Sequence, residues 1–161
     1  MIEEVLESVG YANQNKIGML IAIEREVGLG GIVEAGTRLD ATVTRSLLNT
    51  IFWPGSALHD MGVVIRGDRV VAAGVPFPLA EGDYAPELGS RHRAAIGLSQ
   101  ESDALIIVVS EETGTISVAE RGGLNRKLTI DALRTLLVKG VGRTDVNLAD
   151  PDNGQTTSEV A

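Results

Sequence analysis

The chain has 161 residues, of which 43% are hydrophobic, and a formal net charge of −8. This length and composition favour one globular domain with a hydrophobic core and exclude global disorder. The acidic balance argues against broad nucleic-acid binding, which needs a basic face, and the absence of cysteine excludes disulfides, thiolate catalysis and cysteine-based zinc sites.

The ends and the hydropathy of the chain predict a soluble protein. The longest apolar runs, such as residues 104–109, are far too short to span a bilayer, and the N-terminus has no signal-peptide pattern. The chain turns polar after Arg143 and carries no further basic residue, which predicts a disordered acidic tail over residues 144–161. Residues 1–143 are therefore predicted to form one domain.

Helices and buried strands alternate in the first part of the chain. Apolar residues recur at helical spacing over roughly the first dozen residues, which predicts an amphipathic helix. Residues 17–24 form an almost unbroken apolar run, typical of a strand that is buried on both faces. Residues 41–52 are predicted to form a helix that begins after Asp40 as its N-cap and ends before Pro54.

The next strands indicate the class of fold. Residues 63–66 and 69–74 flank the dipeptide Gly67-Asp68, which predicts a β-hairpin. Residues 103–109 and 115–119 are also predicted to be strands. The sequence therefore predicts an α/β fold with a mixed central sheet of about six strands, flanked by about four or five helices.

A cluster of cation-capable side chains follows a glycine and a serine in the stretch Gly89-Ser90-Arg91-His92-Arg93. Ser90 is predicted to cap a buried helix, so that free backbone N–H groups and the positive end of the helix dipole meet there. The guanidinium groups match phosphate oxygens in pairs. The pattern indicates a phosphate-binding site, and the alternative is a solvated charged helix face.

Two other polar clusters lie at ends of predicted strands, namely His59-Asp60 and Ser110-Glu111-Glu112. An aspartate at such a position is often only a turn-stabilising residue. The adjacent glutamates suit magnesium or manganese, or form a solvent-facing acidic turn. If the three clusters converge, they provide the groups that phosphoryl or nucleotidyl transfer requires.

Three motifs resemble the catalytic domain of the bacterial diadenylate cyclases, especially the membrane-anchored type. They occupy residues 58–65, 89–95 and 109–114, in the order found in that family. The similarity runs from about Ile17 to near Val138. The resemblance implies the diadenylate cyclase domain fold and the condensation of two ATP molecules into cyclic di-AMP with release of two pyrophosphates. It also implies a cytoplasmic location, as a soluble protein or as the cytoplasmic domain of a membrane-anchored one.

The resemblance further implies roles for individual residues. Asp60 would assist the attacking ribose 3′-hydroxyl and bind a divalent metal, Mn²⁺ or Mg²⁺. The implied catalytic residues are Asp60, Arg91, His92 and Arg93; the implied nucleotide contacts are Met61, Gly62, Phe77, Leu79, Ser90, Arg91, His92, Arg93, Ser110 and Glu111; the implied metal ligands are His59, Asp60 and Glu112.

One site holds one ATP, whereas the product joins two, so a homodimer with facing sites is expected. The chain departs from the family at Met61, where glycine is usual, and at Ser90, where threonine is usual. Met61 favours an alternative function, a non-catalytic module that senses ATP or cyclic di-AMP, whereas Asp60 and Glu112 favour the enzyme. A structural or regulatory domain without a ligand is the third alternative.

Overall fold

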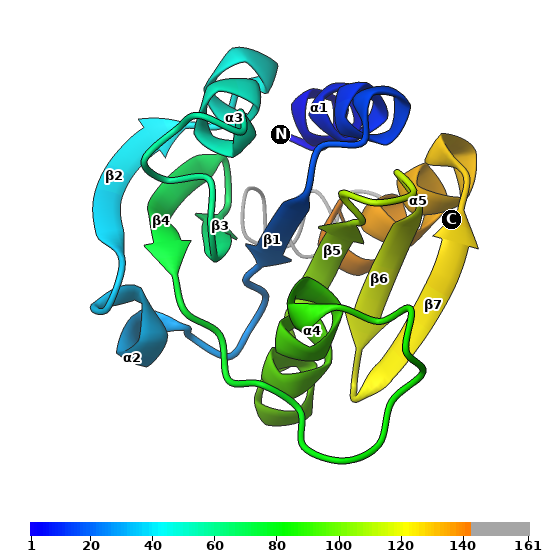
Figure 1. Cartoon of the computed structure of the whole chain (residues 1–161). Coiled ribbons are helices and arrows are strands. Elements are labelled where there is room, and N and C mark those ends of the chain that lie inside the picture. The colour runs from blue at the N-terminus through cyan, green and yellow to red at the C-terminus, as the bar shows by residue number, and fades with distance from the viewer. Residues whose placement is uncertain (143–161) are drawn as a thin grey trace, which may run out of the picture.

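A mixed sheet forms the centre of the computed structural model, which describes residues 1–142. Its strands follow the order β2-β4-β3-β1-β5-β6-β7 (Figure 1). Only β1 and β3 are parallel neighbours, and every other pair of neighbours is antiparallel. The strands are β1 (Met19–Ile23), β2 (Thr37–Thr42), β3 (Gly62–Arg66), β4 (Arg69–Val75), β5 (Leu105–Val109), β6 (Ile116–Glu120) and β7 (Gly123–Leu128).

Helices cover both faces of this sheet, which confirms the predicted α/β class (Figure 1). On one face, α1, α3 and α5 share a core with strand residues such as Ile21 and Ile107. On the other face, α4 packs on residues such as Leu20 and Ile106. The helices are α1 (Ile2–Asn15), α2 (Gly30–Val33), α3 (Arg45–Phe52), α4 (Ser90–Glu101) and α5 (Ile130–Leu137), the last followed by a π-helical turn (Val138–Gly142).

The two edge strands, β2 and β7, are absent from the sequence prediction. Asp40 lies within β2, so its prediction as an N-cap is wrong. The cap of α3 is Thr44, whose Oγ1 accepts a hydrogen bond from the backbone N–H of Leu47 at 3.0 Å. Both strands pair with one neighbour only and carry polar residues on an exposed face, as edge strands commonly do.

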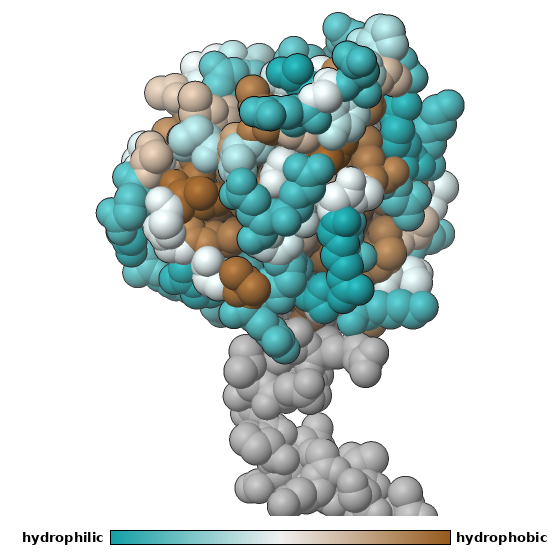
Figure 2. Space-filling view, turned by 90° about the horizontal axis from the view of Figure 1, so that it is seen from below, coloured by the Kyte–Doolittle hydropathy of each residue, from teal (hydrophilic) through white to brown (hydrophobic). Residues whose placement is uncertain are grey.

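Residue 143 and the predicted acidic tail, residues 144–161, lie outside the described residues. Within the described part of the chain, no helix has both the length and the apolar composition to cross a membrane. Figure 2 views the molecule from below. Hydrophilic residues cover much of this face, and apolar residues lie between them in smaller groups.

Candidate functional site

Two of the predicted polar clusters lie at one edge of the sheet, here the edge formed by the ends of the central strands β1, β3 and β5. Because β3 runs parallel to β1, the two strands begin at the same edge. Because β5 is antiparallel to β1, with Met19 opposite Val109, β5 ends where β1 begins. His59-Asp60 therefore precedes β3 at the edge where Ser110 follows β5.

Helix α4 brings the third cluster to this edge. Gly89, and not Ser90 as predicted, is the N-cap, and Ser90 is the first helical residue. A glycine has no side chain with which to cap, and no side chain in residues 1–142 caps the first turn of α4. The first N–H groups and the positive end of this helix dipole are therefore available to an anion.

Two cavities meet at the start of α4. The polar cavity has a volume of about 120 Å³ and the apolar cavity about 550 Å³. Ser90, Arg91 and Glu111 line both cavities and form the wall between them. The polar cavity is further lined by Pro86, Glu87, Gly89, His92, Ser110 and Glu112, and the apolar cavity by Leu20, Asp60, Met61, Pro76, Phe77, Leu79 and Ala94.

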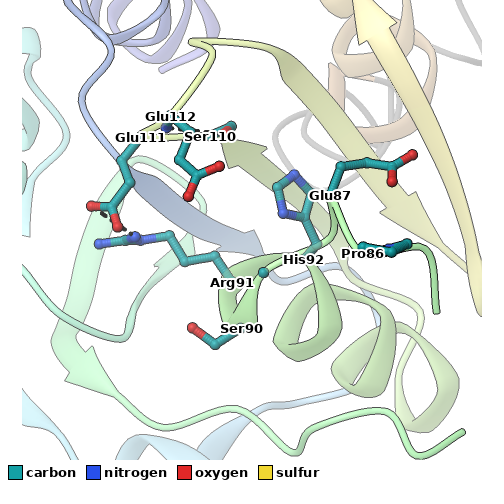
Figure 3. Close-up of a pocket in the computed structure, with 9 residues that line it drawn as sticks. Pro86, Glu87, Ser90, Arg91, His92, Ser110, Glu111 and Glu112 are labelled. Carbon is teal, nitrogen blue, oxygen red and sulfur yellow. Dashed lines mark hydrogen bonds and ion pairs between the residues drawn. The ribbon is translucent and has the colours of Figure 1, made fainter. Parts of the chain in front are cut away.

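Arg91 is the centre of the shared wall. Its Nη1 lies 3.4 Å from Oε2 of Glu111, an ion pair drawn in Figure 3, and its Nη2 lies 3.4 Å from Nε2 of His59. The guanidinium group rests against the backbone of Gly18, where a Cβ atom would come within 2.6 Å of Arg91 Cζ. Contacts on several sides hold this cation between the cavities.

His59 is oriented by a backbone carbonyl. Its Nδ1 lies 2.8 Å from the carbonyl oxygen of Phe52, so the ring donates its Nδ1–H there and keeps a lone pair on Nε2. A histidine that binds a metal commonly donates its other ring N–H in this way. Here Nε2 faces Nη2 of Arg91 at 3.4 Å. Imidazole nitrogen and the carboxylate oxygens of Asp60 and Glu112 are donor types that divalent cations take. Within residues 1–142, no three histidine, aspartate or glutamate side chains already form a metal-binding group.

The Ser110 hydroxyl organises the turn after β5. Its oxygen accepts the backbone N–H groups of Glu112 and Thr113 at 3.2 and 3.3 Å. The oxygen acts as an acceptor in both bonds, so its own O–H remains able to donate to an anion in the polar cavity.

His92 is the buried member of the polar cavity, with 5% of its surface exposed. Its Nδ1 has no hydrogen-bond partner among the described residues. Burial lowers the pKa of His92 below its ordinary value, and the positive charges of Arg126 and Arg91 lower this pKa further. His92 is therefore neutral near pH 7 and presents an uncharged ring to the cavity.

The apolar cavity is shaped by an aromatic ring and a strained backbone. Phe77 packs on Gly62 so closely that a Cβ atom there would lie 2.4 Å from the ring carbon Cζ. Met61 has a φ of 67°, in the left-handed region that favours glycine, and is 53% exposed at the cavity. Glycine adopts this left-handed backbone without strain, which gives a physical reason for the glycine that is usual here in the family that the sequence resembles.

Most of the predicted site residues line the two cavities, but three do not. His59 contacts Arg91, and Gly62 seats Phe77, so both lie directly behind the cavity wall. Arg93 lines neither cavity. Because successive helical residues point about 100° apart, Arg91, His92 and Arg93 cannot share one direction.

The sequence prediction does not include Gly18 or Glu87. Gly18 precedes an apolar strand, and nothing in its neighbours indicates that an arginine of a distant helix packs on it. Glu87 lies in an acidic loop whose composition suggests only solvent exposure. Its proximity to His92 and to the polar cavity depends on how this loop packs (Figure 3).

Comparisons with known proteins show the family to which the chain is similar. A family model described as DisA bacterial checkpoint controller nucleotide-binding (DAC) matches residues 6–124. The chain is 44% identical over 137 residues to the cyclic di-AMP synthase CdaA of Bacillus subtilis, covering 84% of this chain and 50% of that protein. It is 39% identical over 140 residues to a diadenylate cyclase of Listeria monocytogenes, covering 86% of this chain and 51% of that protein.

A solved structure is similar in fold as well as in sequence. The crystal structure of a double mutant of DacA from Staphylococcus aureus matches with a TM-score of 0.84 and 38% identity. The match covers 86% of this chain and 93% of that one. The chain spans about half the length of the curated relatives named above.

Proposed function

Because the chain belongs to the DAC family of nucleotide-binding domains, we propose that it is a diadenylate cyclase. It would join two ATP molecules into cyclic di-AMP in the cytoplasm and release two pyrophosphates. Each linkage forms when a ribose 3′-oxygen attacks the α-phosphorus of the other ATP. The bond from that phosphorus to the bridging oxygen of pyrophosphate then breaks, and the hydroxyl proton is lost.

The observation that carries this proposal is the pair of cavities with a common wall. The apolar cavity, with Phe77 and Leu79, suits an adenine ring. The polar cavity, at the uncapped start of α4, suits a polyphosphate. Arg91 lies between them, where the α-phosphate of one nucleotide would sit.

The chemistry of the reaction assigns roles to the residues around this wall. The guanidinium group of Arg91 would neutralise charge that develops on the α-phosphate and on the leaving pyrophosphate. The N–H groups at the start of α4 and the Ser110 hydroxyl would bind the phosphate oxygens. Asp60, exposed at the apolar cavity, would accept the proton of the attacking 3′-hydroxyl. Arg93 stays a predicted member of the site.

A divalent metal would be held by His59, Asp60 and Glu112, as their donor atoms permit. Mg²⁺ commonly takes one or two carboxylates together with phosphate oxygens of the substrate, so a complete cage of protein ligands is not required. When bound, Mn²⁺ or Mg²⁺ supplies Lewis-acid neutralisation of the phosphate charge.

Two protomers would face each other across a two-fold axis, because each site accommodates one ATP and the product contains two adenylates. The exposure of Asp60 and Glu111 supports this arrangement, since a nucleotide on a second protomer could reach the reacting groups from solvent. Catalysis would then depend on protein concentration, and the rate per protomer would rise as dimers form.

One observation favours a second candidate function, a module that senses ATP or cyclic di-AMP without turnover. Met61 places a long side chain at the apolar cavity where the related family commonly has glycine. Such a side chain could hold a nucleotide in a pose from which the two reacting atoms do not meet.

The experiment that tests the proposal is incubation of the purified chain with ATP and either Mn²⁺ or Mg²⁺, with products separated by chromatography and identified by mass. We expect cyclic di-AMP and pyrophosphate in a ratio of one to two, and a rate per protomer that increases with protein concentration. ATP that is bound but unchanged, with both metals and at every concentration, would contradict the cyclase and favour the sensor.

A further inference from the structure

A second arginine, Arg126, does not line the polar cavity but pairs with a residue that does. Arg126 of β7 forms an ion pair with Glu87, with 3.2 Å between Nη1 and Oε1, and Glu87 lines the polar cavity. In Figure 3, the Arg91–Glu111 pair and the Glu87 carboxylate lie on opposite sides of His92. Arg126 thus reaches the cavity region from the side that Arg91 does not occupy.

An irregularity in the sheet directs Arg126 toward this region. Ile116 pairs with Leu128 and Val118 pairs with Asn125, so that two residues of β7, Arg126 and Lys127, lie opposite one residue of β6. Lys127 has a φ of 56°, in the left-handed region. Bulges of this kind redirect side chains and are frequent beside active sites.

The consequence of the bulge is visible in the packing of β7. Leu124 packs against the core on the α4 face of the sheet, whereas Leu128 packs against the core on the opposite face. In a regular strand these two residues, four positions apart, would share one face. The bulge at Lys127 therefore lets Arg126 face the α4 side with Leu124 while Leu128 joins the other core.

The positive charge of Arg126 acts on His92. The charge of Arg126 is the second cause, after burial, of the lowered pKa of His92. The buried Nε of Arg126 and the buried Nδ1 of His92 both lack a hydrogen-bond partner in the part of the chain that the structure describes. The polar cavity thus combines an unsatisfied buried ring nitrogen with a nearby arginine, and an anionic oxygen would interact favourably with this surrounding positive charge.

The two arginines beside the polar cavity are matched in one more respect. Arg91 is paired with Glu111 and Arg126 with Glu87, so each guanidinium group forms an ion pair with a carboxylate. We propose that Arg126 is a further polyphosphate-binding residue, which Glu87 occupies until the β- and γ-phosphates of the nucleotide displace it. This inference rests on the proposed binding of ATP and extends it to the leaving pyrophosphate.

The exchange is favourable because the two interactions differ in strength. The Arg126–Glu87 pair is partly exposed, with 33% and 57% of the two side chains accessible, and exposed pairs contribute little. An arginine can bind two phosphate oxygens at once through charge-assisted hydrogen bonds, which are stronger. Loss of the carboxylate contact therefore costs less free energy than the phosphate contact contributes.

The test compares equilibrium binding of ATP and of AMP, which lacks the β- and γ-phosphates, under the same metal conditions. We expect Arg126→Gln to weaken ATP binding by about 10-fold or more and to leave AMP binding unchanged. Glu87→Gln should strengthen ATP binding by about 2- to 5-fold, because a competitor is removed. Arg134→Gln is the matched control, since Arg134 pairs with Glu3 on the other face of the sheet.

Two further variants complete the test. The double variant Glu87→Gln with Arg126→Gln should bind ATP more weakly than Glu87→Gln alone, because most of the gain from removing the Glu87 carboxylate depends on the freed Arg126. Arg126→Lys, which keeps the charge, should recover part of the ATP affinity, and thermal unfolding of each variant checks that it is folded. Equal loss of ATP and AMP binding, or no loss of ATP binding, in folded Arg126→Gln would overturn the inference.

The binding measurement does not depend on turnover. If the chain binds ATP and forms no cyclic di-AMP, the cyclase proposal fails, and the ATP-to-AMP comparison still decides the role of Arg126. If cyclic di-AMP forms and Arg126→Gln binds ATP as the unchanged protein does, only the inference about Arg126 fails.

Discussion

The polar and apolar cavities share one wall but are built in different ways. Charges and free backbone N–H groups shape the polar cavity, which Arg91 lines. Arg91 pairs with Glu111, and Arg126 pairs with Glu87 beside the cavity. Close packing shapes the apolar cavity, where Phe77 rests on Gly62 and Met61 takes a strained backbone conformation. Substitutions in the polar cavity should therefore change only the binding of the phosphates. Substitutions in the apolar cavity should change the binding of every adenine nucleotide.

The largest expected effect comes from Asp60, which lies at the apolar cavity but is assigned to the chemistry. Asp60→Asn keeps the shape of the side chain and removes its ability to accept a proton. We expect turnover to fall by about 10²- to 10⁴-fold, with ATP affinity changed by less than about 3-fold, as product formation and equilibrium binding would measure. Unchanged turnover in Asp60→Asn would remove this residue from the reaction, and equal losses of turnover and binding would assign it to nucleotide binding instead.

Gly62→Ala should damage the apolar cavity specifically. The added methyl group would lie 2.4 Å from Cζ of Phe77 and force the ring toward the space proposed for adenine. Overpacking of this kind destabilises a fold by about 1–3 kcal/mol. Because the displaced ring would occupy the proposed adenine space, we expect AMP and ATP affinities to fall by the same factor, about 10-fold.

Gly28→Ala is the matched control for this variant, because a Cβ atom at Gly28 meets no other atom within 4 Å. Binding of both nucleotides to the control should be unchanged. A loss of ATP affinity without a loss of AMP affinity in Gly62→Ala would show that the two cavities are not separate in the way described.

The central strands of the fold were predictable, and the edge strands were not. β1 and β5 are buried on both faces, so their sequences are continuous apolar runs. β2 and β7 carry polar and charged residues, and β7 also contains the bulge at Lys127, so neither has the regular alternation that predicts a strand.

The same distinction applies to the site. The residue type of Arg91 indicates phosphate binding directly, whereas Ser110 and Glu111 are predicted as nucleotide contacts through the resemblance to the family. Two contacts of Arg91, its ion pair with Glu111 and its packing on Gly18, depend on the pairing of β1 with β5 in the sheet. Arg126 carries no local signal at all, since its position depends on a register shift between two strands.

Met61→Gly should change stability more than function. A residue other than glycine in the left-handed region costs about 1–2 kcal/mol, and part of this gain is offset because glycine loses more entropy on folding. We expect a net stabilisation of about 1 kcal/mol and a rise in Tm of about 3 °C, as thermal unfolding would measure.

Met61→Ala is the control, because alanine also removes the long side chain but keeps the Cβ atom and hence the strain. If the two variants have the same Tm, the backbone at this position is not strained. An increase in turnover in both variants, by contrast, would show that the methionine side chain itself limits the reaction.

The smallest expected effect is a pH dependence that comes from His92. Its pKa in the folded chain lies below the ordinary value of 6.5, first because of burial and then because of Arg126 and Arg91. Below about pH 6.5 the unfolded chain therefore binds more protons at this residue than the folded chain, and stability falls as pH decreases.

His92→Gln removes this contribution, so its free energy of unfolding should decrease less than that of the unchanged protein between about pH 7.5 and about pH 5.5. Urea unfolding at the two pH values measures the difference. The same decrease in both proteins would mean that His92 is not held neutral by its surroundings.

The most direct test of the two-cavity account is a crystal structure of the chain with 3′-deoxy-ATP, which has no attacking hydroxyl and so stays intact. The account predicts the adenine in the apolar cavity against Phe77, the α-phosphate beside Arg91, and the β- and γ-phosphates in the polar cavity at the start of α4. A triphosphate that lies outside the polar cavity, or an adenine that lies within it, would contradict the account.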